Sequence, residues 1–131
     1  MAAFDSLRIA GSSMGMHQTW LDALSHNIAN VNTVRRTDQT AFQAQLVVAD
    51  ARADGGVSVR GLELSDPAGR LVQNPSHPLA DADGNVRMPD ADLGAQLTEL
   101  VVAQRGFQAA VSVTKTAQDT YASALQIGRR S

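Results

Sequence analysis

This 131-residue sequence predicts a mainly α fold: long N- and C-terminal helices, paired as an antiparallel, coiled-coil-like domain, with a small β-hairpin and loop segment between them. Two observations lead to this expectation. Apolar residues recur with heptad spacing at both ends of the chain, as in long paired helices. The middle contains alternating valines and all four prolines, a pattern typical of short strands and loops. The chain therefore divides into an N-terminal helix (residues 1–33), a central segment (34–92) and a C-terminal helix (93–131).

The first helix is predicted from Phe4 to Val31, because its apolar residues return every seven positions. Such residues fall on one stripe of a helix and form a seam for a partner helix. Two interleaved sets make this seam: Leu7, Met14, Leu21 and Ile28, and Ala10, His17, Leu24 and Val31. Asn32 and Thr33 are the predicted helix exit, since asparagine tolerates the left-handed conformation that often ends a helix.

The central segment is predicted to hold one β-hairpin. Residues 55–64 contain alternating valines and indicate a strand, and residues 70–72 indicate a strand that returns after a tight turn at Asp66–Gly69. Residues 74–92 are rich in proline, glycine and aspartate and are expected to be an extended loop. The segment from Phe42 to Ala49 fits either a short strand or a helical piece.

The last helix is predicted from Leu93 to Gly128, with Gly128 as its C-terminal cap and two arginines after it. Its expected seam again has two sets: Leu93, Leu100, Phe107, Thr114 and Tyr121, and Leu97, Gln104, Val111, Gln118 and Leu125. Both terminal helices also carry apolar residues away from the seam. These second faces contain Ile9, Met16, Trp20 and Ala23 in the first helix and Val102, Ala109, Val113 and Ile127 in the last.

A helix that is apolar on two faces needs more than one neighbour. Either the chain's own central segment covers the second faces, or other protein chains do. The central segment is short and polar, which favours other chains.

Asparagines interrupt the first seam at Asn27 and Asn30. An amide in an apolar seam lowers stability but specifies register, because a displaced neighbour leaves it unpaired. The alternative is that both amides face water near a fraying helix end. The candidate interface combines seam, second faces and amides: Leu7, Ile9, Met14, Met16, Trp20, Leu21, Leu24, Asn27, Ile28, Asn30, Asn32, Leu100, Val102, Phe107, Val111, Val113, Tyr121 and Leu125.

Composition argues against several functional classes. The formal net charge is −2 and no Lys/Arg run occurs, so a nucleic-acid surface is not expected. Cysteine is absent, which excludes disulfides, thiolate catalysis and Cys-ligated zinc. No window approaches the ~18 consecutive apolar residues of a membrane helix. The first residues do not resemble a cleavable secretory signal.

No arrangement of residues predicts catalysis or metal binding. Counted from Asp81 as an EF-hand calcium loop, the sixth and twelfth positions hold Val86 and Asp92 instead of glycine and glutamate. The three histidines lack ligand spacing, and His17 is expected to pack in the seam. Neither a nucleophile elbow nor a phosphate loop appears. We therefore expect no enzyme, no cofactor and no small-molecule substrate.

Three stretches resemble the axial proteins of the bacterial flagellum, which are the rod, hook and junction proteins. Residues 27–33 (NIANVNT) are similar to the segment that closes the first helix in that family. Residues 74–89 resemble a stretch of its proximal rod proteins, and residues 99–109 and 125–129 resemble their C-terminal helix. The chain departs from the family at Ala110, where asparagine is common.

The resemblance implies a structural subunit of the basal-body rod. Its terminal helices would pack against copies of itself and other rod proteins in a helical tube that transmits torque and encloses an export channel. It also implies export by the flagellar type III apparatus without a cleaved signal, and a final place in the rod within the periplasmic space. The alternative is a soluble helical adaptor or secretion chaperone that binds one partner through the same apolar faces in a small, defined complex.

Overall fold

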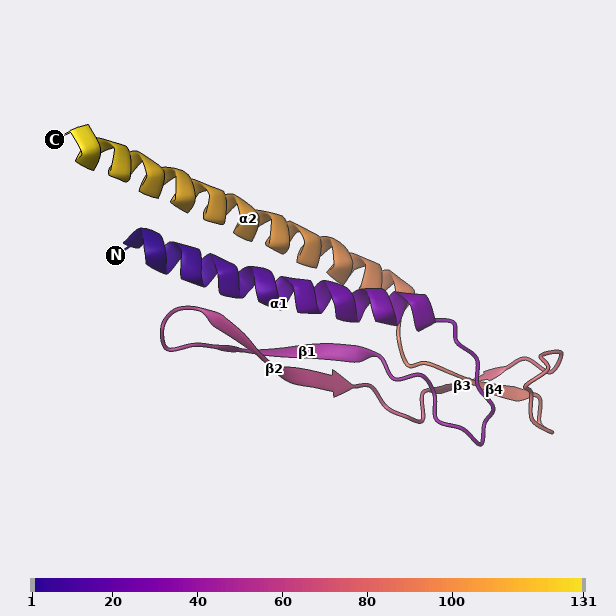
Figure 1. The fold of residues 1–131 in the computed structure, drawn as a ribbon. Coiled ribbons are helices and arrows are strands. Elements are labelled where there is room, and N and C mark those ends of the chain that lie inside the picture. Colours follow the sequence, from indigo (N-terminus) through magenta and orange to yellow (C-terminus); the bar gives the residue numbers. More distant parts are fainter. Residues whose placement is uncertain (1, 131) are drawn as a thin grey trace.

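The computed structural model of the protein describes residues 2–130 and has the predicted fold class. Its elements are α1 (Ala2–Asn30), β1 (Gln45–Ala51), β2 (Val57–Leu64), β3 (Arg70–Gln73), β4 (Asn85–Met88) and α2 (Leu93–Arg130). The two helices lie side by side and antiparallel, with both chain ends at the same end of the pair (Figure 1).

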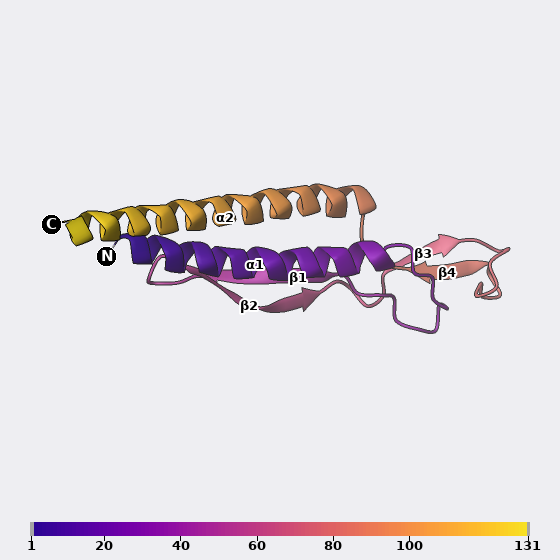
Figure 2. The same cartoon turned by 45° about the horizontal axis from the view of Figure 1, so that its top comes forward.

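The helix α1 is the middle layer of the molecule. The helix α2 lies along one side of α1, and the β1–β2 hairpin lies along another side (Figures 1 and 2). The smaller β3–β4 pair lies beyond the end of α1 that is remote from the chain termini (Figure 1). As a result, α1 is covered by its own chain on two faces, whereas most of α2 has only α1 beside it.

The predicted seam of α1 is confirmed. Leu24 is 2% exposed, Ala10 and Val31 are also buried, and the remaining seam residues are half-buried. Heptad spacing found this seam because the apolar stripe of α1 is formed by residues large enough to stand out in the sequence.

The predicted seam of α2 is half right. Its first set is half-buried from Leu100 through Tyr121, but Leu97, Val111 and Leu125 of the second set are exposed, at 45%, 41% and 52%. The residues that face α1 instead recur three positions after the first set and are alanines: Ala103, Ala110 and Ala117. Both choices have heptad spacing, and small side chains permit a closer approach between helices than large ones.

The two helices are tightly packed at Gly106 of α2. A Cβ atom there would overlap the imidazole ring of His17. His17 is held in place by its own helix, since its Nδ1 donates to the carbonyl oxygen of Ser13 (2.7 Å). His17 is thus a packed seam residue, as predicted, and glycine is the residue that leaves room for it.

The strand pairing differs from the predicted single hairpin. β1 pairs antiparallel with β2, and β3 pairs antiparallel with β4, in two separate sheets. Residues 55–64 and 70–72 do form strands, but the prediction that they pair with each other is wrong. The segment from Phe42 to Ala49 contributes a strand instead of a helix, and the predicted loop 74–92 contains β4.

The turn at Asp66–Gly69 shows why β3 does not fold back on β2. The turn forms as expected, with the Gly69 N–H donating to the Asp66 carbonyl (3.0 Å) and Gly69 at φ 56°. However, the Pro67 carbonyl accepts the N–H of Ala41 (2.8 Å), and a Cβ on Gly69 would overlap Ala41 and Met88. The turn is therefore held against the segment before β1 and against β4, and this position directs β3 to β4.

Asp81 organises the loop between β3 and β4. Its carboxylate accepts the backbone N–H of Asn85 (2.8 Å) and of Asp83 (3.0 Å) and the hydroxyl of Thr37 (3.0 Å). These bonds, above all that from Asn85, hold the pKa of Asp81 below its usual value. Within residues 2–130, no cluster of three or more His, Asp or Glu side chains is placed to hold a metal ion.

The helix ends differ from prediction in two places. α1 ends at Asn30, and positive φ angles occur only at glycines in the described chain, so Asn32 is not a left-handed cap. Gly128 lies inside α2, which continues to Arg130, so it is not the predicted C-terminal cap. Arg129 and Arg130 lie in the last turn, where cations are favourable. No helix in residues 2–130 is long and apolar enough to cross a bilayer.

Candidate assembly surface

Asn27 connects three elements of the fold. Its side chain is 1% exposed, and its Nδ2 donates to the Gln45 carbonyl of β1 and to Oε1 of Gln96 on α2, both at 2.9 Å. Its Oδ1 accepts the Gln45 N–H (2.7 Å). The amide is fully paired in the interior, so for Asn27 the alternative of a water-facing amide is wrong. It specifies how α1, β1 and α2 dock within one chain.

The other two candidate amides lie at the end of α1. Asn30 is half-buried, and its Nδ2 donates to the His26 carbonyl (2.9 Å) while its Oδ1 accepts the Thr33 hydroxyl (3.2 Å). Asn32 is exposed. Asn30 therefore closes the last turn of the helix, and only Asn32 presents its amide outward.

The second face of α1 is covered by the β1–β2 hairpin. Ile9 Cδ1 lies within van der Waals reach of Gly55, and the Val57 N–H donates to the Ser12 hydroxyl (3.1 Å). Met16 borders the same contact, and Trp20 of the same face is half-buried. The second face of α1 is therefore covered by the chain's own central segment, which was one of the two explanations considered.

An ion pair fastens the hairpin turn to the start of α1. Arg8 lies 2.6 Å from a carboxylate oxygen of Asp54, which also accepts a hydrogen bond from Arg52 (2.8 Å). The backbone N–H of Gly56, together with the two arginines, holds the pKa of Asp54 below its usual value. These charges stabilise the cover over α1, and the hairpin that carries Arg52 and Asp54 lies on the side of α1 remote from α2 (Figure 1).

The outer surface of α2 has no such cover. Two apolar stripes flank its seam with α1. One stripe carries Leu97, Val111 and Leu125, which we call the leucine ridge, and the other carries Val102 and Val113, which are 53% and 49% exposed. Between the stripes lies a column of exposed polar side chains at heptad spacing: Thr98, Arg105, Ser112, Asp119 and Gln126.

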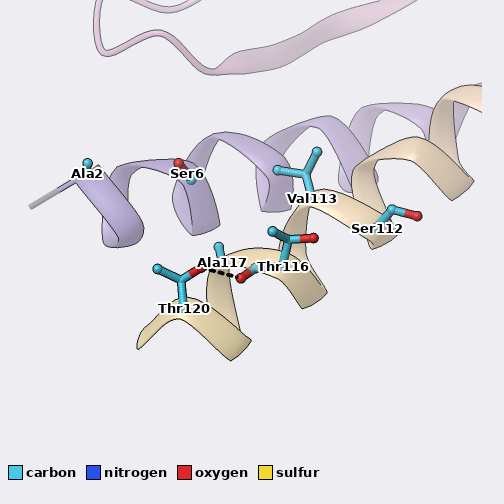
Figure 3. A pocket seen from close by; sticks show the side chains of 7 residues that line it. All are labelled: Ala2, Ser6, Ser112, Val113, Thr116, Ala117 and Thr120. Atoms are coloured by element: carbon cyan, nitrogen blue, oxygen red, sulfur yellow. Dashed lines mark hydrogen bonds between the residues drawn. The ribbon is translucent and has the colours of Figure 1, made fainter. Parts of the chain in front are cut away.

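A groove of about 430 Å³ lies where the second stripe meets the start of α1. We call it the small-residue groove. One wall comes from α1 and the other from α2, with the buried Ala117 between them (Figure 3). The α1 wall is formed by Ala2 and Ser6, and the α2 wall by Ser112, Val113, Thr116 and Thr120. None of its lining side chains is charged.

The polar atoms of the groove do not all need an outside partner. The Thr120 hydroxyl donates to the Thr116 carbonyl (2.9 Å) within α2, as the dashed line in Figure 3 shows. The hydroxyl of a threonine bonded in this way is satisfied, and its methyl group remains for packing. The groove can therefore receive apolar side chains without leaving that hydroxyl unpaired.

Sequence reasoning missed the alanine seam, the small-residue groove and the role of Gly106. The signal for the first was present, since Ala103, Ala110 and Ala117 recur every seven residues as regularly as the leucines do. Large apolar residues are the stronger signal in a sequence, but in this helix Leu97, Val111 and Leu125 lie on the outside. The groove had no signal of its own, because its two walls come from opposite ends of the chain.

Residues 82–127 match the family model described as the C-terminal part of the flagellar basal body rod FlgEFG proteins. Over 98% of its length, the chain is 32% identical to the whole of the flagellar basal-body rod protein FlgC of Salmonella typhimurium. The corresponding protein of Escherichia coli O157:H7 is 33% identical, over 98% of this chain and 100% of its own length. FlgC of Bacillus subtilis is 26% identical, again over 98% and 100%.

Proposed function

Since this chain belongs to the FlgC family of flagellar basal-body rod proteins, we propose that it polymerises through its terminal helices into a helical tube that transmits torque and encloses the export channel. Its role is structural and it is not an enzyme. Its partners in the tube are copies of itself and other rod proteins.

The proposal rests mainly on one observation: within the single chain, α2 is covered only on the side that faces α1. The leucine ridge and the second stripe, exposed between 41% and 53%, run along a helix of 38 residues. Gln104 and Gln118 separate the apolar members of the ridge, but large exposed apolar side chains that recur along a helix still mark a candidate protein interface. Helices that contact one another side by side along a tube resist twisting, because twisting would force each closely packed helix to slide past its neighbour.

The polar column of α2 supports a lumen-facing position for this helix. Arg105 and Asp119 carry opposite charges, and the other three members of the column are neutral. The column lies between the two apolar stripes. If both stripes are covered by neighbouring helices, the column, apart from Ser112 at the groove, is left to face the water-filled channel.

Export in the unfolded state fits the energetics of the helix pair. A buried alanine contributes about one CH₂ equivalent, ~0.8 kcal/mol, whereas a buried leucine contributes ~1.5–3 kcal/mol. The alanine seam of α2 therefore holds the two helices together weakly, and no disulfide resists unfolding because the chain has no cysteine. We propose that the flagellar type III apparatus exports the chain without a cleaved signal and that it reaches the rod in the periplasmic space.

The test uses a strain that lacks this gene and is complemented with variant genes. Wild type should restore swimming and be found in purified basal bodies. Val113→Glu should be exported but be absent from basal bodies, because a carboxylate would lie in an apolar interface. Its free energy of unfolding should change by less than about 0.5 kcal/mol, since Val113 is 49% exposed in the single chain.

Ser58→Glu is the matched control, because Ser58 is exposed on β2, away from α2. This variant should assemble and swim normally. Two results would refute the proposal: wild-type protein that never enters basal bodies, or one that is found only in a small stoichiometric complex with a soluble partner, as an adaptor would be.

A further inference from the structure

The chain exposes more surface than a self-sufficient protein of its mass. Its accessible surface is 8342 Å². A folded monomer of 13.8 kDa exposes about 6,600 Å² by the usual scaling of area with mass. The excess is therefore about 1,700 Å². A standard interface covers about 800 Å² on each partner, so the excess corresponds to two such contacts per copy.

The two apolar surfaces of α2 differ in shape. The leucine ridge projects large side chains from Leu97, Val111 and Leu125. The small-residue groove is hollow and is lined by Ala, Ser, Thr and one Val (Figure 3). A ridge of large side chains packs well into a groove between small ones, which is the general rule for helix contacts.

The ridge and the groove also face in different directions. Val111 and Thr116 are five positions apart on one helix, which separates them by about 140° around its axis. A copy that uses its ridge on one neighbour therefore still presents its groove to another. A contact between two unlike surfaces does not close into a two-fold pair, but repeats from copy to copy.

From these observations we infer that the leucine ridge of one copy packs into the small-residue groove of the next copy of this chain. The inference rests on the proposed rod function and names the contact through which neighbouring copies join. Each copy gives one ridge and one groove, and it therefore takes part in two contacts of this kind, one on each surface. Because the groove has no charged lining residue, the contact desolvates no charge there and should depend little on salt.

Engineered cysteines test the contact directly, since the chain has no cysteine of its own. Val111→Cys and Thr116→Cys are made in separate genes and expressed together in the deletion strain, and purified basal bodies are then oxidised. The mixture should give a disulfide-linked species of two chains. Either variant expressed alone should give none, because a ridge does not meet a ridge and a groove does not meet a groove.

The double variant should form a ladder of linked chains. Its two cysteines point to different sides of one helix and cannot bridge within a molecule. If Val111→Cys fails to enter basal bodies, Leu97→Cys takes its place on the ridge. A charge-reversal pair gives a second readout: Val111→Glu and Thr116→Lys should each abolish swimming, and the double variant should restore it at least in part.

Two results would overturn the inference while the rod function stands. One is the absence of cross-links in basal bodies that contain both cysteine variants. The other is a cross-link formed by Val111→Cys alone, which would indicate a two-fold contact. Wild-type protein that is missing from basal bodies would refute the proposed function itself.

Discussion

Apolar residues recur with the same heptad spacing in both long helices, but the two helices differ in how much of their surface the rest of the chain covers. α1 has 29 residues and lies between α2 and the β1–β2 hairpin, with Leu24 and Asn27 almost wholly buried. α2 has 38 residues, and its buried residues are three alanines. The difference teaches that the fold of one chain is organised around α1. On α2, Leu100, Phe107 and Tyr121 are half-buried, whereas the leucine ridge stays exposed in the single chain.

This division predicts different consequences for substitutions on the two helices. Changes in the interior of α1 should lower the stability of the single chain. Changes on the outside of α2 should leave stability nearly unchanged and affect assembly instead. The following substitutions test whether the division holds, starting with the largest expected effect.

Asn27→Leu should be the most damaging. It removes all three hydrogen bonds of the amide and leaves the Gln45 backbone and Gln96 without their partners in the interior. Unsatisfied buried groups cost about 1–3 kcal/mol each, so we expect a loss of about 3 kcal/mol or more in the free energy of unfolding. Urea denaturation followed by circular dichroism measures this loss.

Asn32→Leu is its control, since Asn32 is exposed after the end of α1. Its unfolding free energy should change by no more than about 0.5 kcal/mol. Equal effects of the two substitutions would contradict the view that α1 and its amide organise the fold.

Gly106→Ala should destabilise by about 1–2 kcal/mol. The added methyl group collides with the His17 ring, and this cost outweighs the gain of about 1 kcal/mol that alanine normally brings to a helix. In a His17→Ala background, the collision is absent and the same substitution should become stabilising by about 1 kcal/mol. A double-mutant cycle of unfolding free energies shows the change of sign.

Gly15→Ala is the matched control on α1. Space around Gly15 is open, so a methyl group meets nothing and the helix should gain about 1 kcal/mol. A gain from Gly106→Ala in the unmodified chain would show that the helices are not in close contact at His17.

At acidic pH, the β1–β2 hairpin should pack less stably against α1, whereas the contact between α1 and α2 should be unaffected. The folded pKa of Asp54 is lowered, so its contribution to stability is present above the ordinary value of about 3.8 and is lost as the pH falls through the lower folded pKa. The effect is the smallest of the three because Asp54 lies at the surface. The measurement is the rate of backbone hydrogen exchange at Gly56 and Val57, corrected for the intrinsic rate at each pH. From neutral pH to pH ~3, this corrected rate should rise more in the wild-type protein than in Asp54→Asn.

In Asp54→Asn, this additional acceleration should be missing. Residues of α2 such as Ala103 should show no Asp54-dependent change, since the hairpin that contains Asp54 lies on the other side of α1 (Figure 1). A parallel change at Ala103 would mean that hairpin and seam open as one unit.

The sequence by itself determined the helices and the family. Heptad spacing located α1 and α2 to within two residues at every end, because periodicity over many turns is a strong local signal. The seam of α1 followed from the same pattern. The resemblance at residues 27–33 and 74–89 pointed to the flagellar axial proteins before any contact was known.

Only the tertiary structure decided which face of α2 meets α1, which strands pair, and what Asn27 binds. Leucine and alanine sets of α2 have the same period, and the choice between them depends on His17 of another helix reaching Gly106. Likewise, Asn27 finds partners 18 and 69 positions away. Local spacing specifies an element, but a contact between distant segments depends on how both side chains fit in space, and that fit has no period along the chain.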